Sequence, residues 1–211
     1  MTRLYVVAEG WTEVNFVTEV LKPHLEERFP NTIMVSAPNL RGYRTYAGLK
    51  KFVNRLFHDQ DPQLRVTTMI DLFKLASDFP GQADPADVSS LKRVLRIEQC
   101  FAEDVDDSRL IPHLQLHEFE ALILVNLPLL AKRHPNRVRA INELAKRLQE
   151  FPTPEHVNRT RPPSYRIREV VPEYDKRLEG AMIVAEIGLT NLRERCEHFG
   201  QWLDRLEACV N

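Results

Sequence analysis

Acidic side chains recur close to the ends of apolar stretches in this chain. The set consists of Glu9, Glu13, Asp71, Glu118 and Glu120. Carboxylate oxygens are the ligands that Mg²⁺ and Mn²⁺ prefer, and these ions keep several waters, which leaves room for a phosphate group. The three cysteines are widely separated and have no Cys-x-x-Cys spacing, so a thiolate zinc site is not predicted. The acids therefore predict a Mg²⁺ or Mn²⁺ site, whose best-known chemistry is phosphoryl transfer.

Three of the four predicted strands deliver an acid at or just beyond their carboxyl end. Apolar and β-branched composition predicts buried strands at 4–8, 32–36, 64–70 and 110–116. Glu9 follows the first of these strands, Asp71 follows the third, and Glu118 comes shortly after the fourth. Because Pro112 lacks an N–H group, we expect the fourth strand to lie at an edge of the sheet or to carry a bulge.

Helical patterns alternate with these strands, and the alternation predicts the fold class. The helices are expected at 14–28, 47–57 and 88–101. Right-handed crossovers then give a Rossmann-like α/β fold over residues 1–125, with a mostly parallel sheet and helices on both faces. Since the carboxyl ends of parallel strands face one way, Glu9, Asp71 and Glu118 are expected to converge at the edge where open α/β sheets bind ligands.

The turn after the first strand has a second interpretation. Gly10 permits a sharp turn, and Thr12 is the expected N-cap of the helix that follows. In this view Glu13 only favours the helix N-terminus through the helix dipole, and Glu9 is solvated. Trp11, inside the same turn, is expected to be a packing residue.

The segment Val7-Ala8-Glu9-Gly10-Trp11-Thr12-Glu13 resembles the first motif of Toprim domains. These domains are the metal-binding module of topoisomerases, primases and the overcoming-lysogenization-defect (OLD) nucleases. Nearly the whole chain is similar to a bacterial Toprim-like family catalogued as domain of unknown function 4276. The further segments that carry this similarity are Thr67-Thr68-Met69-Ile70-Asp71-Leu72-Phe73, Asp78-Phe79-Pro80-Gly81, Gln115-Leu116-His117-Glu118-Phe119-Glu120-Ala121, and the tail from Ile187-Gly188-Leu189 to His198-Phe199.

The resemblance implies roles for individual residues. The first-motif glutamate of Toprim domains, here Glu9, is a general acid/base or a metal ligand, and OLD nucleases bind metal through an acid at the position of Glu13. The second motif is normally Asp-x-Asp, and this chain has Asp71 but carries Phe73 in place of the second acid. The acids that could replace it are Asp78, Glu118 and Glu120. The resemblance thus implies Glu9 and Asp71 as catalytic residues within a Mg²⁺ or Mn²⁺ site.

Two groups of arginines are candidates for contacts to nucleic acid. They are Arg41 and Arg44, in a segment that also carries Tyr43 and Tyr46, and Arg159, Arg161, Arg166 and Arg168, with no acid between them. Guanidinium groups bind phosphate through paired hydrogen bonds, and tyrosine rings can stack on bases. The net charge of −1 gives no overall attraction to nucleic acid, so local patches would have to supply it. In the alternative interpretation these arginines lie in solvated loops and pair with acids elsewhere.

Two histidines flank the acids that follow the fourth strand. His117 directly precedes Glu118, where an imidazole could take part in catalysis or metal binding. It could equally pack under a loop and donate to a backbone carbonyl. His113 would share its face in an unbulged strand.

Composition bounds the class of protein. Of the 211 residues, 43% are hydrophobic and 28% are charged, which is ordinary for a globular chain with one α/β core. No apolar run approaches the roughly 20 residues of a membrane span, and no signal-peptide pattern is present, so we expect a cytoplasmic protein without a membrane partner. Residues 126–211 are expected to form a helical extension packed on the core. Its helices are predicted at 127–133, 136–149 and most of 182–208, with a strand at 183–187 as the alternative.

Two classes of function remain open. The acids, the arginines and the resemblance favour a Mg²⁺- or Mn²⁺-dependent nuclease, which the resemblance links to ATPase-dependent defence or mobile-element systems. The missing second aspartate favours a non-catalytic Toprim-shaped module that partners a separate ATPase, because this chain has no Gly-x-x-x-x-Gly-Lys-Ser/Thr loop. The sequence defines neither the strand order nor the oligomeric state.

Overall fold

A parallel sheet forms the centre of the computed structural model, which describes residues 1–73, 75–82, 89–157 and 161–210. Its strands are β1 (Thr2–Ala8), β2 (Ile33–Ser36), β3 (Leu64–Asp71), β4 (Leu110–Ile111) and β5 (Leu114–Gln115). They lie in the order β2-β1-β3-β4, and β5 pairs with β3 farther along that strand. All of these pairs are parallel, with Val6 of β1 opposite Thr67 of β3. The predicted α/β fold with a mostly parallel sheet is confirmed.

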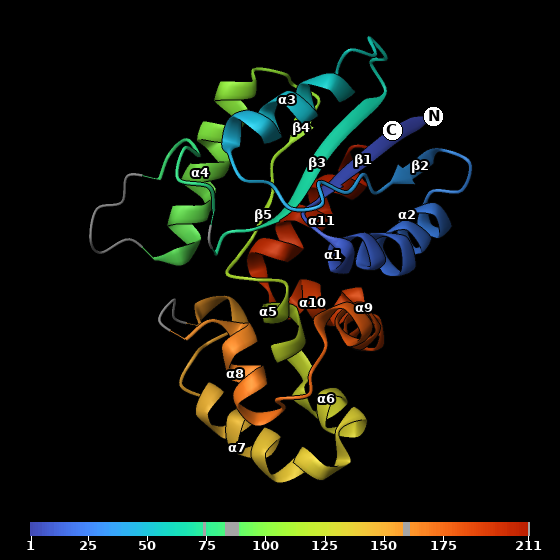
Figure 1. Ribbon diagram of the computed structural model, residues 1–211. Helices are drawn as coiled ribbons and strands as arrows, with labels where there is room; N and C mark the ends of the chain where they lie inside the picture. Colours follow the sequence, from blue (N-terminus) through green and yellow to red (C-terminus); the bar gives the residue numbers. More distant parts are fainter. Residues whose placement is uncertain (74, 83–88, 158–160, 211) are drawn as a thin grey trace.

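Helices cover both faces of this sheet, because successive side chains of a strand point to opposite faces. Leu4 and Val6 of β1 belong to one buried cluster, and Val7 belongs to another. The first cluster includes side chains of α1 (Trp11–Phe16), the π-helical turn η1 (Val17–Leu21) and α2 (Lys22–Arg28); the second includes side chains of α3 (Tyr46–Leu56) and α4 (Ser90–Val105). Figure 1 shows α1 and α2 on one side of the strands and α3 and α4 on the other.

The second half of the chain is helical, as predicted, and much of it lies beyond the carboxyl ends of the strands (Figure 1). Its elements are α5 (Glu120–Ile123), η2 (Leu124–Asn126), α6 (Leu127–Arg133), η3 (Pro135–Arg137), α7 (Val138–Leu148), η4 (Pro154–His156), α8 (Pro163–Val170), α9 (Lys176–Ile187), α10 (Leu189–Arg195) and α11 (Glu197–Ala208). The segment 183–187, for which a strand was the alternative, is helical within α9. Every helix in the described ranges is too short or too polar to cross a bilayer.

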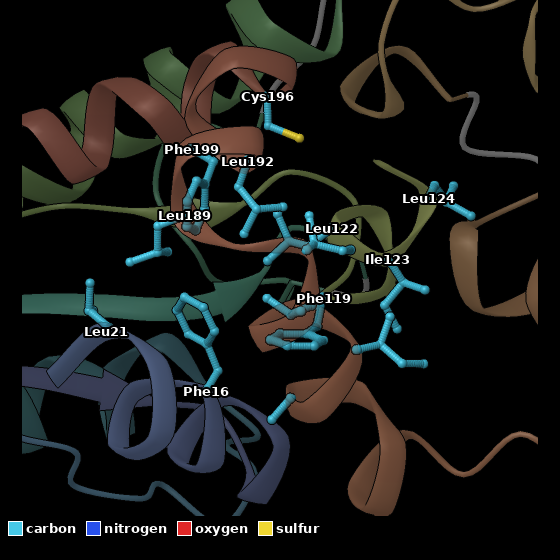
Figure 2. Close-up of a cluster of buried hydrophobic side chains, with 14 of the residues drawn as sticks. Phe16, Leu21, Phe119, Leu122, Ile123, Leu124, Leu189, Leu192, Cys196 and Phe199 are labelled. Carbon is cyan, nitrogen blue, oxygen red and sulfur yellow. The ribbon is translucent and has the colours of Figure 1, made fainter. Parts of the chain in front are cut away.

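Phe16 joins α1 to the helices of the second half. Its ring contacts those of Phe119 and Phe199 edge-on, with centroid distances of 5.9 and 6.1 Å. Figure 2 shows the three rings in one cluster with Leu122 and Leu192. Aromatic pairs of this kind add about 0.5–1.5 kcal/mol to the stabilisation from buried area. The same cluster continues across the predicted boundary near residue 125, so both parts of the chain share one core.

The N-terminus of α1 differs from the prediction. Gly10 is the N-cap residue, the helix begins at Trp11, and Thr12 lies buried in its first turn. The Glu13 side chain reaches back, and its Oε2 accepts a hydrogen bond from Gly10 N at 2.9 Å. This bond corresponds to the second half of a capping box, and it fixes the direction of the Glu13 carboxylate.

Pro112 divides the predicted fourth strand into β4 and β5. A proline cannot donate to the sheet, and the backbone leaves the ladder at this point. The hydroxyl of Thr68 bridges the gap and donates to His113 O at 2.6 Å. Leu114 then resumes the pairing, opposite Ile70.

Candidate functional site

Four carboxylates and one ammonium group meet at the carboxyl edge of the sheet. The Nζ atom of Lys176 lies 3.3 Å from an oxygen of Glu13 and 3.4 Å from an oxygen of Asp71. The carboxylate of Glu120 approaches the same ammonium group to 3.4 Å. Glu9 joins them through its Oε2, which accepts a hydrogen bond from Asp71 N at 3.0 Å. We call these five residues the acid–lysine cluster.

Each acid of the cluster is placed by the start or the end of an element. Glu9 follows β1, and its N–H donates to Met69 O of β3 at 3.1 Å. Asp71 ends β3, and its Oδ1 accepts a hydrogen bond from Phe119 N at 3.0 Å. That bond ties the end of β3 to the start of α5, where Glu120 is the first helical residue.

Lys176 comes from a distant part of the sequence and is the first residue of α9. Asp175 caps this helix and accepts a hydrogen bond from Arg177 N at 2.8 Å. Gly180, one turn farther along, allows α9 to pack tightly on α1, since a Cβ atom there would lie 3.1 Å from Thr12 Cγ2. This close approach of the two helices brings the Lys176 ammonium group among the acids.

Burial and mutual repulsion shift the protonation of the cluster. Burial raises the pKa of Asp71 well above its usual range, in spite of the nearby Lys176 ammonium, and the neighbouring acids raise it further. Burial also raises the pKa of Glu9 and the pKa of Glu120. Burial opposes the charge of Lys176, but the surrounding carboxylates outweigh it and raise the pKa of Lys176 above its usual value. The cluster thus holds more carboxylates than its one cation can neutralise.

The cluster opens into a cleft of about 760 Å³, a size typical of ligand sites. Arg41, Arg168 and Arg177 line this cleft with exposed side chains. Within the part of the chain that the structure describes, none of these three arginines pairs with an acid. Arg41 has a left-handed backbone with a φ of 56°, and the next amide, Gly42 N, donates to Glu9 O at 2.9 Å. The loop after β2 is therefore fastened directly to the acidic edge.

Two of the predicted metal ligands face away from the cluster. The carboxylate of Glu118 accepts hydrogen bonds from Ser164 N at 2.9 Å and from Ser164 Oγ at 3.0 Å. The carboxylate of Asp78 accepts from Tyr46 N at 2.8 Å and from Ala47 N at 3.3 Å, at the N-terminus of α3. Of the six predicted ligands, the structure brings the other four together.

His117 explains why the two acids that follow it have different partners. Its backbone φ is 65°, and this left-handed turn between β5 and α5 separates the direction of Glu118 from that of Glu120. The imidazole is buried, and its Nε2 lies 3.1 Å from Glu155 O. His117 thus shapes the turn and contacts a backbone carbonyl.

The two predicted arginine groups are divided between the cleft and other places. Arg41 and Arg168, one from each group, line the cleft. Arg44 is exposed on the loop before α3 and does not line it. Arg159 lies outside the described residues.

The remaining two arginines have partners inside the helical half. Arg161 lies 3.3 Å from a carboxylate oxygen of Glu169. Arg166 is buried, with its guanidinium over the Phe151 ring and its Nε donating to Arg161 O at 2.9 Å. Arg161 thus contacts an acid, as in the alternative interpretation, whereas Arg166 is buried in α8 against a backbone carbonyl and an aromatic ring.

Trp11 does not pack as expected. Its side chain is 55% exposed and lines the cleft. The reason is the early start of α1: the buried face of this helix consists of Thr12, Glu13 and Phe16, and Trp11 lies on the other side.

The two tyrosines whose rings were candidates for stacking on bases, Tyr43 and Tyr46, pack inside the protein. Tyr46 is buried, and its hydroxyl donates to Asp104. Tyr43 is partly buried against the cluster beneath α3 and α4. Neither tyrosine presents a free ring to the cleft, which Tyr174 lines from a buried position.

Two cations of the cleft, Lys176 and Arg177, are not predicted from the sequence. Both are charged residues in a polar segment, and neither follows a predicted strand. The available signal is Asp175, a good N-cap residue directly before two cations. Such a pattern places cations at the N-terminus of a helix, where the helix dipole is unfavourable to positive charge. Nearby acids are needed to stabilise cations at this position.

A second group of potential ligands is buried in the core. Glu98, His113 and His198 each offer one ligand atom, and these atoms lie within 4.8 Å of one another. Glu98 Oε1 accepts hydrogen bonds from Leu114 N at 2.7 Å and is 2.9 Å from His198 Nε2. The His113 ring stacks on those of His198 and Trp202, with centroid distances of 4.8 and 4.3 Å. This group could hold a metal ion, and among the described residues no other group has three ligand atoms this close.

His113 is kept neutral in this group. Burial lowers its pKa well below the usual value, and the neighbouring His198 and Arg205 lower it further. Neutral imidazole is the form that binds metals. Neither ring nitrogen of His113 has a hydrogen-bond partner among the described residues.

Fold and site together define an α/β protein with an acidic, lysine-containing cluster at the carboxyl edge of a parallel sheet. The profile of the family DUF4276, a domain of unknown function, matches residues 8–207, and the chain belongs to this family. Among solved structures, it is similar to the C-terminal region of the Burkholderia pseudomallei OLD protein, with 14% sequence identity and a TM-score of 0.50 over 100% of both chains. At this identity the similarity is one of fold. No curated protein sequence matches the chain.

Proposed function

We propose that this protein is a Mg²⁺- or Mn²⁺-dependent nuclease that hydrolyses phosphodiester bonds in nucleic acid at the acid–lysine cluster. The observation that carries the proposal is the placement of three carboxylates within 3.4 Å of one ammonium group in an open cleft. Such a cluster has an excess of negative charge that a cation would neutralise, and it is accessible to a large substrate. The fold similarity to a region of an OLD protein supports the same reading.

The donor set fits a hard divalent cation. Glu9, Glu13, Asp71 and Glu120 would hold it, and all four supply oxygen ligands. The nearest oxygens of Glu13, Asp71 and Glu120 lie 3.3–3.4 Å from Lys176 Nζ, whereas Mg²⁺ binds oxygen at about 2.0–2.1 Å. Binding therefore requires the carboxylates to move inward and the ammonium group to move away, which the four-carbon stem of lysine permits.

The bound cation would supply Lewis acidity and favour the hydroxide form of water at neutral pH. Glu9 is the protein group best suited to accept a proton, because burial raises the pKa of its carboxyl group and it lines the cleft. Asp71 holds the position of the site, since it links β3 to α5 through Phe119 N. Lys176 would then be free to contact a phosphate oxygen of the substrate.

The exposed arginines of the cleft would position the nucleic acid. Arg41, Arg168 and Arg177 can contact phosphates next to the scissile one, and such contacts carry no sequence information. Arg166 is left out of this role because it is buried in the helical half.

A second candidate is a non-catalytic module that partners a separate ATPase, as in a defence or mobile-element system. Two observations favour it. Phe73 stands where the Toprim motif has its second acid, and Lys176 already neutralises part of the charge that a metal would neutralise. In that case the acid–lysine cluster is a structural element, and the protein binds metal weakly or not at all.

The experiment that separates the two candidates is a cleavage assay with Mn²⁺ on single- and double-stranded DNA and RNA. We expect the protein to cleave at least one of these substrates. Asp71→Asn should lower this cleavage at least about 10³-fold, because it removes the negative charge of a proposed metal ligand. Glu143→Gln, the same chemical change on the exposed face of α7, is the matched control and should cleave normally. Absence of cleavage on every substrate, also with a neighbouring ATPase added, would contradict the nuclease and favour the module.

A further inference from the structure

Trp11 is the most exposed aromatic side chain at the acid–lysine cluster, and packing within this chain does not explain it. The ring is 55% exposed, although tryptophan is among the side chains that gain most from burial. Among the described residues it makes no aromatic or cation–π contact. The second tryptophan, Trp202, is fully buried. Of the two tryptophans, only the one in the turn between Glu9 and Glu13 is exposed.

The Trp11 ring lies in the cleft where the proposed substrate would bind. Trp11 is the first residue of α1, two residues from each of the two glutamates of the cluster, and it lines the same cleft. A strand held in this cleft by its phosphates therefore has a nucleoside within reach of the indole. The cations of the cleft, Arg41, Arg168 and Arg177, can hold the phosphates of the same strand.

Stacking on an indole requires a base with a free face. In a duplex both faces of a base are covered by its neighbours, so only an end or an extruded nucleotide offers one. Single-stranded segments offer a free face at every base, and sites for them combine aromatic platforms with a cationic groove. The cleft offers one exposed aromatic ring and three exposed arginines beside its acids.

We propose that Trp11 is a base-stacking platform that makes the cleft select single-stranded nucleic acid, or a frayed single-stranded end, over duplex. This inference rests on the proposed function in that it takes nucleic acid as the substrate. It deepens that function, because it assigns a substrate form and a residue that recognises it. Stacking is tolerant of sequence, so the recognition is of strandedness and not of particular bases.

Tryptophan fluorescence tests the proposal without any cleavage. The protein is titrated with oligo-dT, oligo-U and a blunt hairpin of equal charge in EDTA, so that a failure of catalysis cannot affect the result. We expect both single strands to quench the exposed fraction of the emission and the hairpin to quench it weakly. Trp11→Phe leaves only the buried Trp202 as a reporter, so its emission should not respond, while its binding of single strands, followed by anisotropy of a labelled oligonucleotide, stays close to normal.

The decisive comparison is between variants. Trp11→Ala should weaken single-strand binding about tenfold and hairpin binding less than twofold, since loss of one stack has an effect of this size. Because the side chain is exposed, this change should leave the melting temperature unaltered. Equal single-strand affinity of Trp11→Ala and the unaltered protein would overturn the proposal, as would the absence of quenching at saturation or of any oligonucleotide binding.

The same experiments distinguish nucleic acid from a second copy of the chain as the partner of Trp11. If Trp11 were covered by a second copy of the chain, its emission would change with protein concentration alone, and Trp11→Ala would abolish a dimer in sedimentation. That result would also overturn the proposal. Binding with quenching but no cleavage under Mn²⁺ would leave the proposal standing and contradict only the nuclease.

Discussion

The acid–lysine cluster lies in an open cleft, whereas the group of Glu98, His113 and His198 is enclosed in the core. Glu98 is the only acid of its group, and it is satisfied by a backbone amide and by an imidazole. The cluster at the sheet edge has more carboxylates than cations, and burial and repulsion raise the pKa values of Glu9, Asp71 and Glu120.

Each of the two sites lacks one requirement for binding a metal ion. The enclosed group has its ligand atoms already within 4.8 Å of one another, but a metal could enter only if the core opened. The acid–lysine cluster is open to solvent and has an excess of negative charge, but the Lys176 ammonium group holds its acids apart. Proximity of ligand atoms therefore marks one site, and unbalanced charge with solvent access marks the other.

After Asp71→Asn, the largest effect is expected at Lys176, the residue that holds the acids apart. Lys176→Met should lower cleavage about 10²–10³-fold, the usual loss when one preorganised charge on the substrate is removed. The same variant should bind Mn²⁺ more tightly, because the competing ammonium group is gone. Calorimetry and single-turnover cleavage measure the two effects, and weaker Mn²⁺ binding by the variant would contradict the competition between lysine and metal.

The enclosed group should matter for stability. Glu98→Ala leaves Leu114 N and the His198 imidazole without their acceptor and is expected to cost about 2–4 kcal/mol of the free energy of unfolding. Glu98→Gln retains an acceptor oxygen and should cost less. Glu9→Gln, in the other site, should leave the metal-free protein unchanged or more stable. Urea unfolding measures all three, and similar losses for Glu9→Gln and Glu98→Ala would remove the distinction between the sites.

The pH dependence of stability should follow the acids of the cluster. Glu9, Asp71 and Glu120 have pKa values raised by burial, so their favourable contribution is complete below the unfolded pKa values near 4 and is lost as the pH rises through the folded values. Each group contributes at most about 1.4 kcal/mol per pH unit in that window.

Mg²⁺ should reverse this loss, since it favours the ionised acids. Thermal melts between pH 5 and pH 8 measure the effect as a gap in melting temperature between the metal-bound and the metal-free protein. The gap should widen with pH and should narrow in Glu9→Gln. A gap that is constant with pH would count against metal binding at the acids.

The smallest effect is expected for the arginines of the cleft. Arg168→Ala together with Arg177→Ala should weaken oligonucleotide binding and lower the slope of log affinity against log salt by about 1–2, because each lost phosphate contact releases one counterion fewer. Arg139→Ala, on the exposed part of α7, is the matched control. An unchanged salt slope in the double variant would place the phosphate contacts elsewhere.

The sequence predicts the sheet well because its strands are apolar and end at punctuating residues. β1 and β3 are β-branched, buried segments, and the acids that follow them, Glu9 and Asp71, meet as parallel pairing requires. Pro112 also predicts the interruption between β4 and β5. These features depend on local composition and on the fixed handedness of the crossovers.

The rest of the site depends on contacts that no local pattern encodes. Lys176 reaches Asp71 across 105 residues of sequence, and the contact requires α9 to pack on α1 at Gly180. The choice between Glu118 and Glu120 depends on the left-handed backbone of His117. Side-chain type and spacing therefore identify the acids, and tertiary packing selects the ones that share a site.

The most direct test of the account is anomalous X-ray diffraction from crystals grown with Mn²⁺. We predict a manganese peak among Glu9, Glu13, Asp71 and Glu120, with the Lys176 ammonium group moved away from the carboxylates that it contacts at 3.3–3.4 Å. A peak only at Glu98, His113 and His198, or no peak at all with Lys176 still among the acids, would contradict the claim that the open cluster is the metal site.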